Sequence, residues 1–270
     1  MNPLISAAAL LSALDGVTVL DVRYRMGGPP GRDGYAAGHV PGAAYVDLDT
    51  DLAAPAGSGG RHPLPDADDF AAAMRRCGVR ADRPVVVYDD WSAHAAGRCW
   101  WLLRHHGHRN VRVLDGGWTA WLAAGGRAET DAPELALGDF TVGPGDMEIV
   151  EADDVLDVAV LLDARTAERY RGEVEPVDPV AGHIPGAINV ATSLNLAPDG
   201  RFLPAVELRA LYAEVGAVAG ADIAVYCGSG VTATHDLIAL EVAGVRARLY
   251  PGSWSGWIAD PDRPVTSGCL

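Results

Sequence analysis

The sequence predicts an α/β protein of two tandem domains, each a mostly parallel sheet flanked by helices. Two observations carry this prediction. Short β-branched segments alternate with helical patterns, as in βα units. In addition, four patterns of the first half recur in the same order in the second half, about 140 residues later. The length of 270 residues fits two domains at the usual ~150 residues each.

The repeated patterns also divide the chain. They are "VLDVR" (19–23) with "LLDAR" (161–165), "AAGHVPGAAYV" (36–46) with "VAGHIPGAINV" (180–190), "VVVYDDW" (85–91) with "IAVYCGS" (223–229), and "VLDGGWTAW" (113–121) with "LYPGSWSGW" (249–257). A polar segment with several Gly and Pro residues lies between the copies and is typical of a linker. We therefore expect a first domain over 1–126, a linker over 127–146 and a second domain over 147–270.

The second copy illustrates the alternation. Strands are expected over 158–164, 222–227 and 246–250, and helices over 205–216, 231–244 and 253–258. Ligands of open parallel sheets bind at the carboxyl ends of the strands. Cys227 stands at that end of its predicted strand, which makes it the first candidate for chemistry.

Composition excludes several function classes. The net charge of −15 disfavours nucleic acid and anionic membranes as partners, since both need a basic surface. The chain has no lysine, which excludes Walker-type phosphate binding and Schiff-base or pyridoxal-phosphate chemistry. We find no apolar segment of transmembrane length and no basic region before the first apolar stretch. A cytoplasmic protein is therefore expected.

The cysteines point to one reactive thiol. Cys77, Cys99, Cys227 and Cys269 are never paired as C-x-x-C, so a thiolate metal site is not expected. Structural disulfides are not expected without a secretion signal. Cys77 and Cys99 lie in helical patterns and are predicted to be buried and inert, whereas Cys269 is expected to be exposed and incidental. Cys227 alone precedes a Gly-rich turn and a helix.

The segment "CGSGVTA" (227–233) is suited to holding an anion. Gly228 and Gly230 are expected to take positive φ and to direct backbone N–H groups inward, and the helix predicted from Val231 adds its positive end. Such amides favour a thiolate and would equally stabilise a persulfide, Cys–S–S⁻. The structural alternative is a Gly-rich turn with a buried cysteine. A cysteine phosphatase requires C-x5-R, and Ala233 occupies the arginine position.

Together these motifs resemble the tandem-domain sulfurtransferases of the rhodanese family. The resemblance rests on "GHVPGA", "GHIPGA", "LDGGWTAW", "YPGSWSGW" and "CGSGVTA", and it covers nearly the whole chain. It implies two rhodanese-like domains and catalysis by a Cys227 persulfide without metal or organic cofactor. The first copy has Asp89 at the cysteine position and is similar to the non-catalytic half of the family. His39 and His183 of the G-H-x-P-G-A segments are expected to be structural.

The loop composition is most similar to that of 3-mercaptopyruvate sulfurtransferases. Thiosulfate-using members resemble C-R-K-G-V-T-A, whereas the loop here is neutral. The resemblance implies a Ser–His–Asp arrangement drawn from both domains, with Ser229, His62 and Asp49. His62 could instead be a solvated loop histidine.

Substrate binding is also inferred from the resemblance. It assigns Arg169 to the substrate carboxylate, although Arg169 could instead be a surface salt-bridge partner. The family commonly has a second arginine further along, where this chain has Asp178. The loop residues expected to contact the transferred group are Gly228, Gly230, Val231 and Thr232.

The sequence thus predicts a sulfurtransferase. Sulfur would pass from a small anionic donor, 3-mercaptopyruvate, through Cys227 to an acceptor, which is a thiol such as thioredoxin or a small thiol, or cyanide. No nucleic acid or membrane partner is expected. Two alternatives remain, namely thiosulfate as the donor and a non-catalytic rhodanese-type binding module.

Overall fold

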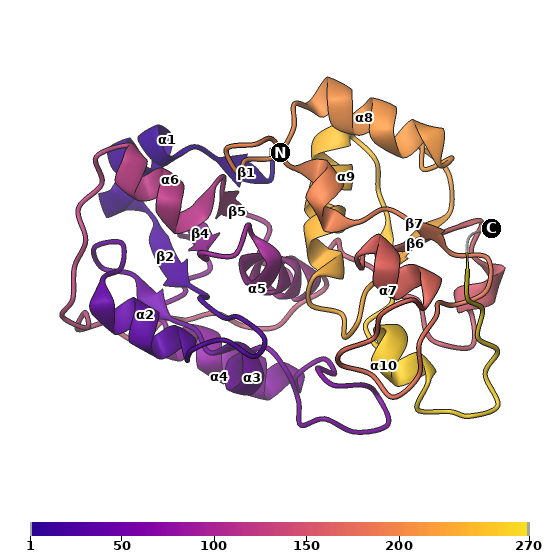
Figure 1. Ribbon diagram of the computed structural model, residues 1–270. Helices are drawn as coiled ribbons and strands as arrows, with labels where there is room; N and C mark the ends of the chain where they lie inside the picture. The colour runs from indigo at the N-terminus through magenta and orange to yellow at the C-terminus, as the bar shows by residue number, and fades with distance from the viewer. Residues whose placement is uncertain (1, 269–270) are drawn as a thin grey trace. The chain divides into compact units, whose positions relative to one another are not determined.

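The computed structural model describes residues 2–268 and divides the chain into two compact units. The first unit comprises the chain up to Ala54, Leu64–Met147 and Pro198–Arg201, and the second comprises Pro55–Pro63, Glu148–Ala197 and Phe202 onward. Each contains a sheet and flanking helices (Figure 1). The segment Pro55–Pro63, which contains His62, therefore packs with the second unit although it lies in sequence between α3 (Leu48–Asp51) and α4 (Ala67–Arg76) of the first unit.

The first unit has a parallel sheet with the strand order β1-β5-β4-β2-β3. Its strands are β1 (Leu4–Ile5), β2 (Thr18–Asp21), β3 (Ala44–Tyr45), β4 (Val85–Tyr88) and β5 (Val111–Leu114). Its helices are α1 (Ala7–Ala13), the 3-10 helix η1 (Leu14–Gly16), α2 (Gly31–Ala37), α3 (Leu48–Asp51), α4 (Ala67–Arg76), α5 (His94–His105) and α6 (Gly117–Ala123).

The second unit repeats this arrangement with the order β7-β6-β8-β9, again parallel. Its strands are β6 (Val160–Asp163), β7 (Ile188–Asn189), β8 (Ile223–Tyr226) and β9 (Arg248–Leu249). Its helices are the 3-10 helices η2 (Val155–Asp157) and η3 (Thr192–Asn195) together with α7 (Ala167–Arg171), α8 (Ala205–Glu214), α9 (Ala233–Ala243) and α10 (Ser253–Trp257). No helix within residues 2–268 combines the length and apolar character needed to cross a membrane.

Residues at matching positions of the two copies make the same core contacts, so the duplication is visible in the packing as well as in the sequence. Tyr88 on β4 and Tyr226 on β8 are both fully buried, and each hydroxyl accepts a backbone N–H from the G-H-x-P-G-A segment of its own copy. His39 and His183 stack on a tyrosine of the preceding helix, with ring centroids 3.9 and 3.8 Å apart. These histidines therefore have structural surroundings, as the sequence predicts.

A buried ion pair lies at the carboxyl end of an interior strand in each copy, β6 in the second and β2 in the first. Asp163 ends β6 and accepts hydrogen bonds from the guanidinium of Arg165, which also donates to the Gly182 carbonyl at 2.7 Å. Asp21 and Arg23 repeat this pair in the first copy. Because both partners are desolvated, the pair fixes the backbone at the carboxyl end of the strand, where the functional loops begin.

The first copy fills its strand-to-helix loop with the carboxylate of Asp89, which follows β4. Asp89 Oδ1 accepts the amides of Trp91 and Ala93, and Oδ2 accepts those of Ala95 and Ala96, all at 2.9 Å. Burial raises the pKa of Asp89, although the four amides act in the opposite direction. The anion-binding geometry of this loop is therefore satisfied by the chain itself.

Replacing Asp89 tests this arrangement. Asp89→Ala leaves four buried amides without their acceptor, at roughly 1–3 kcal/mol for each unsatisfied group, so we expect a loss of several kcal/mol in the free energy of unfolding. Urea denaturation measures it. Asp89→Asn retains one acceptor oxygen and should recover part of the loss.

Asp90→Ala is the matched control, because Asp90 makes only a half-exposed ion pair with Arg25 at 3.7 Å, which is worth about 0–1 kcal/mol. Sulfur transfer per folded molecule should remain near the wild-type rate in Asp89→Ala. An Asp89→Ala protein as stable as Asp90→Ala, or folded but inactive, would contradict the assignment.

Candidate active site

Cys227 stands at the carboxyl end of β8, the strand between β6 and β9. All four residues of β8 are buried, and Cys227 itself is 1% exposed. The backbone around Cys227 is fixed from α10, because its N–H donates to Ser253 Oγ at 3.1 Å and its carbonyl accepts the Trp254 amide at 2.9 Å. The sulfur therefore lies on a rigid part of the fold, where an open sheet binds its ligands.

The loop directs a backbone amide at the sulfur. The Gly230 N–H donates to Cys227 Sγ at 3.2 Å, and Gly230 has a φ of 76°. A Cβ on Gly230 would lie 2.4 Å from the Pro251 carbonyl oxygen, so only glycine fits. Positive φ was expected at Gly228 too, but Gly228 does not adopt it. Gly230 alone supplies the left-handed turn that directs the amide.

Helix α9 begins at Ala233, two residues later than the sequence suggested. Val231 and Thr232 form the turn that leads into it, and the Val231 carbonyl accepts both the amide and the hydroxyl of Thr234. The N-terminus of α9 still follows the loop directly, so its partial positive charge lies close to the sulfur. Contact of Val231 or Thr232 with a substrate stays a prediction.

Two other cysteines have surroundings that suppress thiolate formation. Burial raises the pKa of Cys77 to about 11, and the charge of Asp51 adds to the increase. Burial also raises the pKa of Cys99 well above its ordinary value. Both are therefore protonated at neutral pH, as expected for inert thiols. Cys269 lies outside the described residues.

His62 and Ser229 meet within the second unit. His62 Nδ1 and Ser229 Oγ are 2.7 Å apart, which is a hydrogen bond, and Ser229 is two residues from Cys227. The backbone next to His62 is anchored, since the Arg61 N–H donates to Ser255 Oγ at 3.1 Å. The pair can relay a proton to or from a group bound beside Cys227.

Asp49, the third member of the predicted arrangement, belongs to the first unit. It lies in the short helix α3, where its backbone N–H donates to Asp47 Oδ1 at 3.1 Å. Its orienting role toward His62 stays a prediction.

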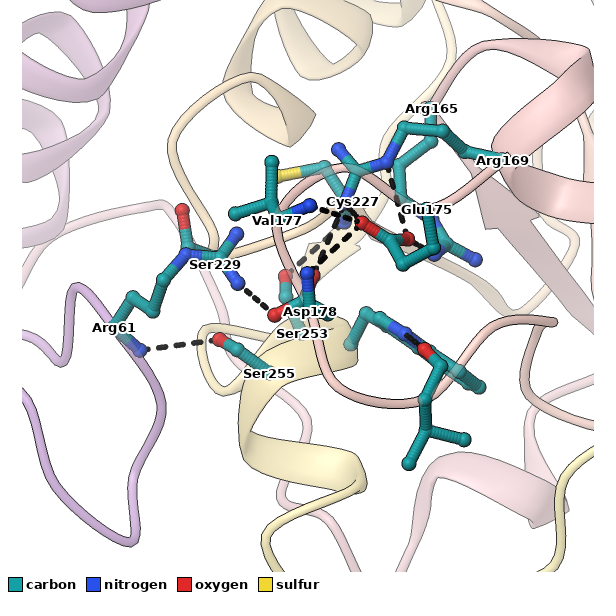
Figure 2. A network of polar contacts seen from close by, with 12 residues as sticks. Arg61, Arg165, Arg169, Glu175, Val177, Asp178, Cys227, Ser229, Ser253 and Ser255 are labelled. Carbon is teal, nitrogen blue, oxygen red and sulfur yellow. Dashed lines mark hydrogen bonds and ion pairs between the residues drawn. The ribbon is translucent and has the colours of Figure 1, made fainter. Parts of the chain in front are cut away.

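Arg169 belongs to a partly buried arginine–carboxylate network (Figure 2). Its guanidinium donates to Glu175 at 2.7 and 3.2 Å and to Asp178 Oδ2 at 3.0 Å. The network consists of Arg61, Arg165, Arg169, Asp163, Glu175 and Asp178. Although burial acts in the opposite direction, hydrogen bonds from Arg169 and from the Asp178 and Val177 amides hold the pKa of Glu175 below its usual range.

Arg61 is a component of the site that sequence reasoning missed. Its guanidinium forms an ion pair with Asp178 Oδ1, across 117 residues of sequence. The only available signal was its position directly before His62 in "GGRHPLP". A Cβ on Gly228 would lie 2.8 Å from Arg61 Nη2 and 3.5 Å from Arg169 Nη1. Both guanidiniums therefore face the residue next to Cys227.

Asp236 is a second omission. It is fully buried in α9, and its Oδ1 accepts the Asn195 amide at 2.7 Å. Burial raises the pKa of Asp236 well above its usual range, and the nearby Cys227 adds to the increase. Both effects disfavour the ionised form of the Asp236 carboxyl group.

Comparison with known proteins identifies the family of this chain. The model of the Rhodanese-like domain matches residues 6–124 and 148–260. A putative thiosulfate sulfurtransferase, SseB, from Mycobacterium tuberculosis is 48% identical over 97% of this chain and 94% of its own length. A probable 3-mercaptopyruvate sulfurtransferase from Pseudomonas aeruginosa is 46% identical over 97% of this chain and 95% of its own length.

A solved structure of another sulfurtransferase is also similar to this chain. SseA from Escherichia coli, described as a 3-mercaptopyruvate sulfotransferase, superposes with a TM-score of 0.80 at 34% identity, over 94% of this chain and 100% of that chain. The predicted fold and enzyme class are thereby confirmed: the chain belongs to the rhodanese family and is a sulfurtransferase with two rhodanese-like domains.

Proposed function

We propose that this chain transfers sulfane sulfur from 3-mercaptopyruvate to an acceptor through a persulfide on Cys227, and that its second domain alone carries the transferred sulfur. The Gly230 amide at 3.2 Å from Cys227 Sγ is the observation that supports this most strongly. The same amide stabilises negative charge on Cys227 or on a sulfur bonded to it.

The first half-reaction balances without a cofactor. The Cys227 thiolate attacks the sulfur of the donor thiol, the carbon–sulfur bond breaks, and its electron pair moves into the enolate of pyruvate. The proton of the donor thiol is then transferred to the enolate carbon, which gives pyruvate and Cys–S–S⁻. The His62–Ser229 pair, 2.7 Å apart, is placed to move this proton.

The second half-reaction returns the enzyme to its thiolate. The acceptor thiol gives its proton to the persulfide anion, and the acceptor thiolate then attacks the outer sulfur of the protonated persulfide. The sulfur–sulfur bond breaks, and Cys227 leaves with the electron pair as the thiolate. The product is the acceptor persulfide, or thiocyanate when cyanide attacks. A cytoplasmic thiol, such as thioredoxin or a small thiol, is the acceptor that we propose.

Thiosulfate is the second candidate donor. The M. tuberculosis relative at 48% identity is described as a putative thiosulfate sulfurtransferase. With thiosulfate the thiolate takes the outer sulfur and sulfite leaves with the electron pair, so no proton has to move. The neutral loop "CGSG" and the His62–Ser229 pair favour mercaptopyruvate. Kinetics with both donors side by side decide between them.

Cys227 is expected to hold the sulfur covalently. Incubation with donor and no acceptor should add the mass of one sulfur atom to the peptide that contains Cys227, and cyanide should remove it. Cys227→Ser should abolish turnover. Peptide mass spectrometry makes the measurement, and sulfur on Cys77 or Cys99 would overturn the assignment.

His62 is expected to matter more for mercaptopyruvate than for thiosulfate. Only the first donor has a leaving group that needs proton transfer, and removal of one general acid–base group typically costs ~10²–10⁴-fold in rate. His62→Ala and Ser229→Ala should therefore lower kcat/KM for mercaptopyruvate far more than for thiosulfate. Thiosulfate serves as the internal control, and equal losses with both donors would exclude the proposed role.

A further inference from the structure

The carboxylate of Asp178 occupies a position between two guanidiniums (Figure 2). Oδ1 forms the ion pair with Arg61, and Oδ2 accepts from Arg169 Nη2 at 3.0 Å. Only 3% of the Asp178 side chain is exposed. The two arginines come from segments far apart in the sequence, so each oxygen of one carboxylate has its own cationic partner. A free carboxylate ligand would be bound in the same way.

This arrangement lies beside the reactive sulfur. Both guanidiniums face Gly228, as the distances to a Cβ at that residue show, and Gly228 follows Cys227 directly. The side chain of Arg61 is 25% exposed and that of Arg169 15% exposed. An anion that approaches Cys227 past Gly228 would therefore meet Arg61 Nη2 and the guanidinium of Arg169. The same two guanidiniums now hold Asp178, through Arg61 Nη1 and Arg169 Nη2.

The charges of the network explain why Asp178 would compete with such an anion. Arg165 is held by Asp163 at 2.6 Å, and Arg169 is held by Glu175 at 2.7 Å. Asp178 adds the charge that balances Arg61. An entering anion finds a neutral network while Asp178 stays in place, and finds net positive charge once Asp178 has left.

We infer that Arg61 and Arg169 together bind the anionic group of the sulfur donor, and that Asp178 is an internal competitor for those hydrogen bonds. The inference deepens the proposed function and rests on it only in requiring an anionic donor. Arg61 takes the part of a second anion-binding arginine from a different segment, and Asp178 sets the affinity for the donor.

The surroundings of both residues agree with these roles. Burial raises the pKa of Asp178, and the charges of Arg61 and Arg169 oppose this only in part. Its ionised form is therefore not strongly stabilised in place. The Arg61 backbone is fixed by Ser255, and a Cβ on the adjacent Gly60 would lie 2.8 Å from the Gly252 carbonyl oxygen. The guanidinium thus extends from an anchored segment and needs only to exchange its partner.

Two alkylating agents that differ in charge test the inference without any sulfur donor. Iodoacetate and iodoacetamide both transfer a carbon to the thiolate with loss of iodide, but only iodoacetate is an anion. Peptide mass spectrometry gives the rate constant of each at Cys227. Their ratio reports the binding of the anion, and the iodoacetamide rate reports any general change in the loop.

The expected changes have opposite signs. Asp178→Asn should raise the iodoacetate-to-iodoacetamide ratio about tenfold, because it removes the competing charge. Arg61→Gln or Arg169→Gln should lower the ratio about tenfold, which corresponds to the lower end of the range for the loss of one charge-assisted hydrogen bond. Arg61→Lys should retain part of the preference for the anion.

Glu173→Gln and Arg171→Gln are the matched controls. They remove one charge each from the same part of the chain, and their mutual ion pair at 2.8 Å lies outside the arginine–carboxylate network. Their ratios should stay within about twofold of wild type, because exposed charges are screened.

Different results would contradict the role of Asp178 and the role of Arg61. An unchanged or lowered ratio in Asp178→Asn would show that Asp178 only fastens the loop, and an unchanged ratio in Arg61→Gln would remove Arg61 from the anion site. If Arg61→Gln does not fold, Arg61→Lys and Asp178→Asn decide. A shift in the ratio without persulfide formation from either donor would preserve the anion site and reject the proposed donors.

Discussion

The hydrogen bond from the Gly230 amide to Cys227 Sγ, 3.2 Å long, is the interaction on which the site depends. It requires positive φ at Gly230, the close approach of the Pro251 carbonyl, and a strand that ends at Tyr226. Each requirement is met by core packing, because β8 is completely buried and α10 bonds the Cys227 backbone on both sides. Sulfur chemistry is therefore assigned to a position that the fold has already made rigid.

The two copies use the same geometry for opposite purposes. In the first copy four amides converge on the carboxylate of Asp89, so the chain supplies its own acceptor for them. In the second copy a cysteine stands at this position, and in the proposed mechanism the negative charge belongs to its thiolate or to the persulfide formed on it. A carboxylate cannot accept sulfane sulfur, since it has no sulfur with which to form a persulfide. Under the proposed function, duplication has produced one structural and one reactive version of a single anion-binding loop.

The sequence predicted the parts of this structure that depend on local pattern. The β8–loop–α9 unit and the burial of Cys77 and Cys99 follow from apolar runs and glycine positions within a few residues. The family resemblance predicted that His62 and Ser229 act together, and the structure places them in hydrogen-bond contact. Arg61 was missed because only its ion pair with Asp178 makes it part of the site. Asp178 is 117 residues away, and no local pattern encodes such a pair. For the same reason Asp178 could be recognised only as an absent arginine, whereas the structure shows a carboxylate with two cationic partners.

An internal competitor such as Asp178 would affect both the binding of the donor and the release of the product. The donor and the product that leaves after sulfur transfer carry the same carboxylate, so strong binding by Arg61 and Arg169 would hold the product as firmly as the substrate. Binding that is equally strong in the ground state and in the transition state does not raise the rate of the chemical step. A carboxylate that returns to these arginines weakens both complexes, and it restores a neutral network around the newly formed persulfide anion. Tight donor binding and rapid clearance of an anionic product place opposite demands on the same guanidiniums. In a chain with a net charge of −15, the Asp178 carboxylate meets both demands, because it can give way to the donor and return when the product leaves.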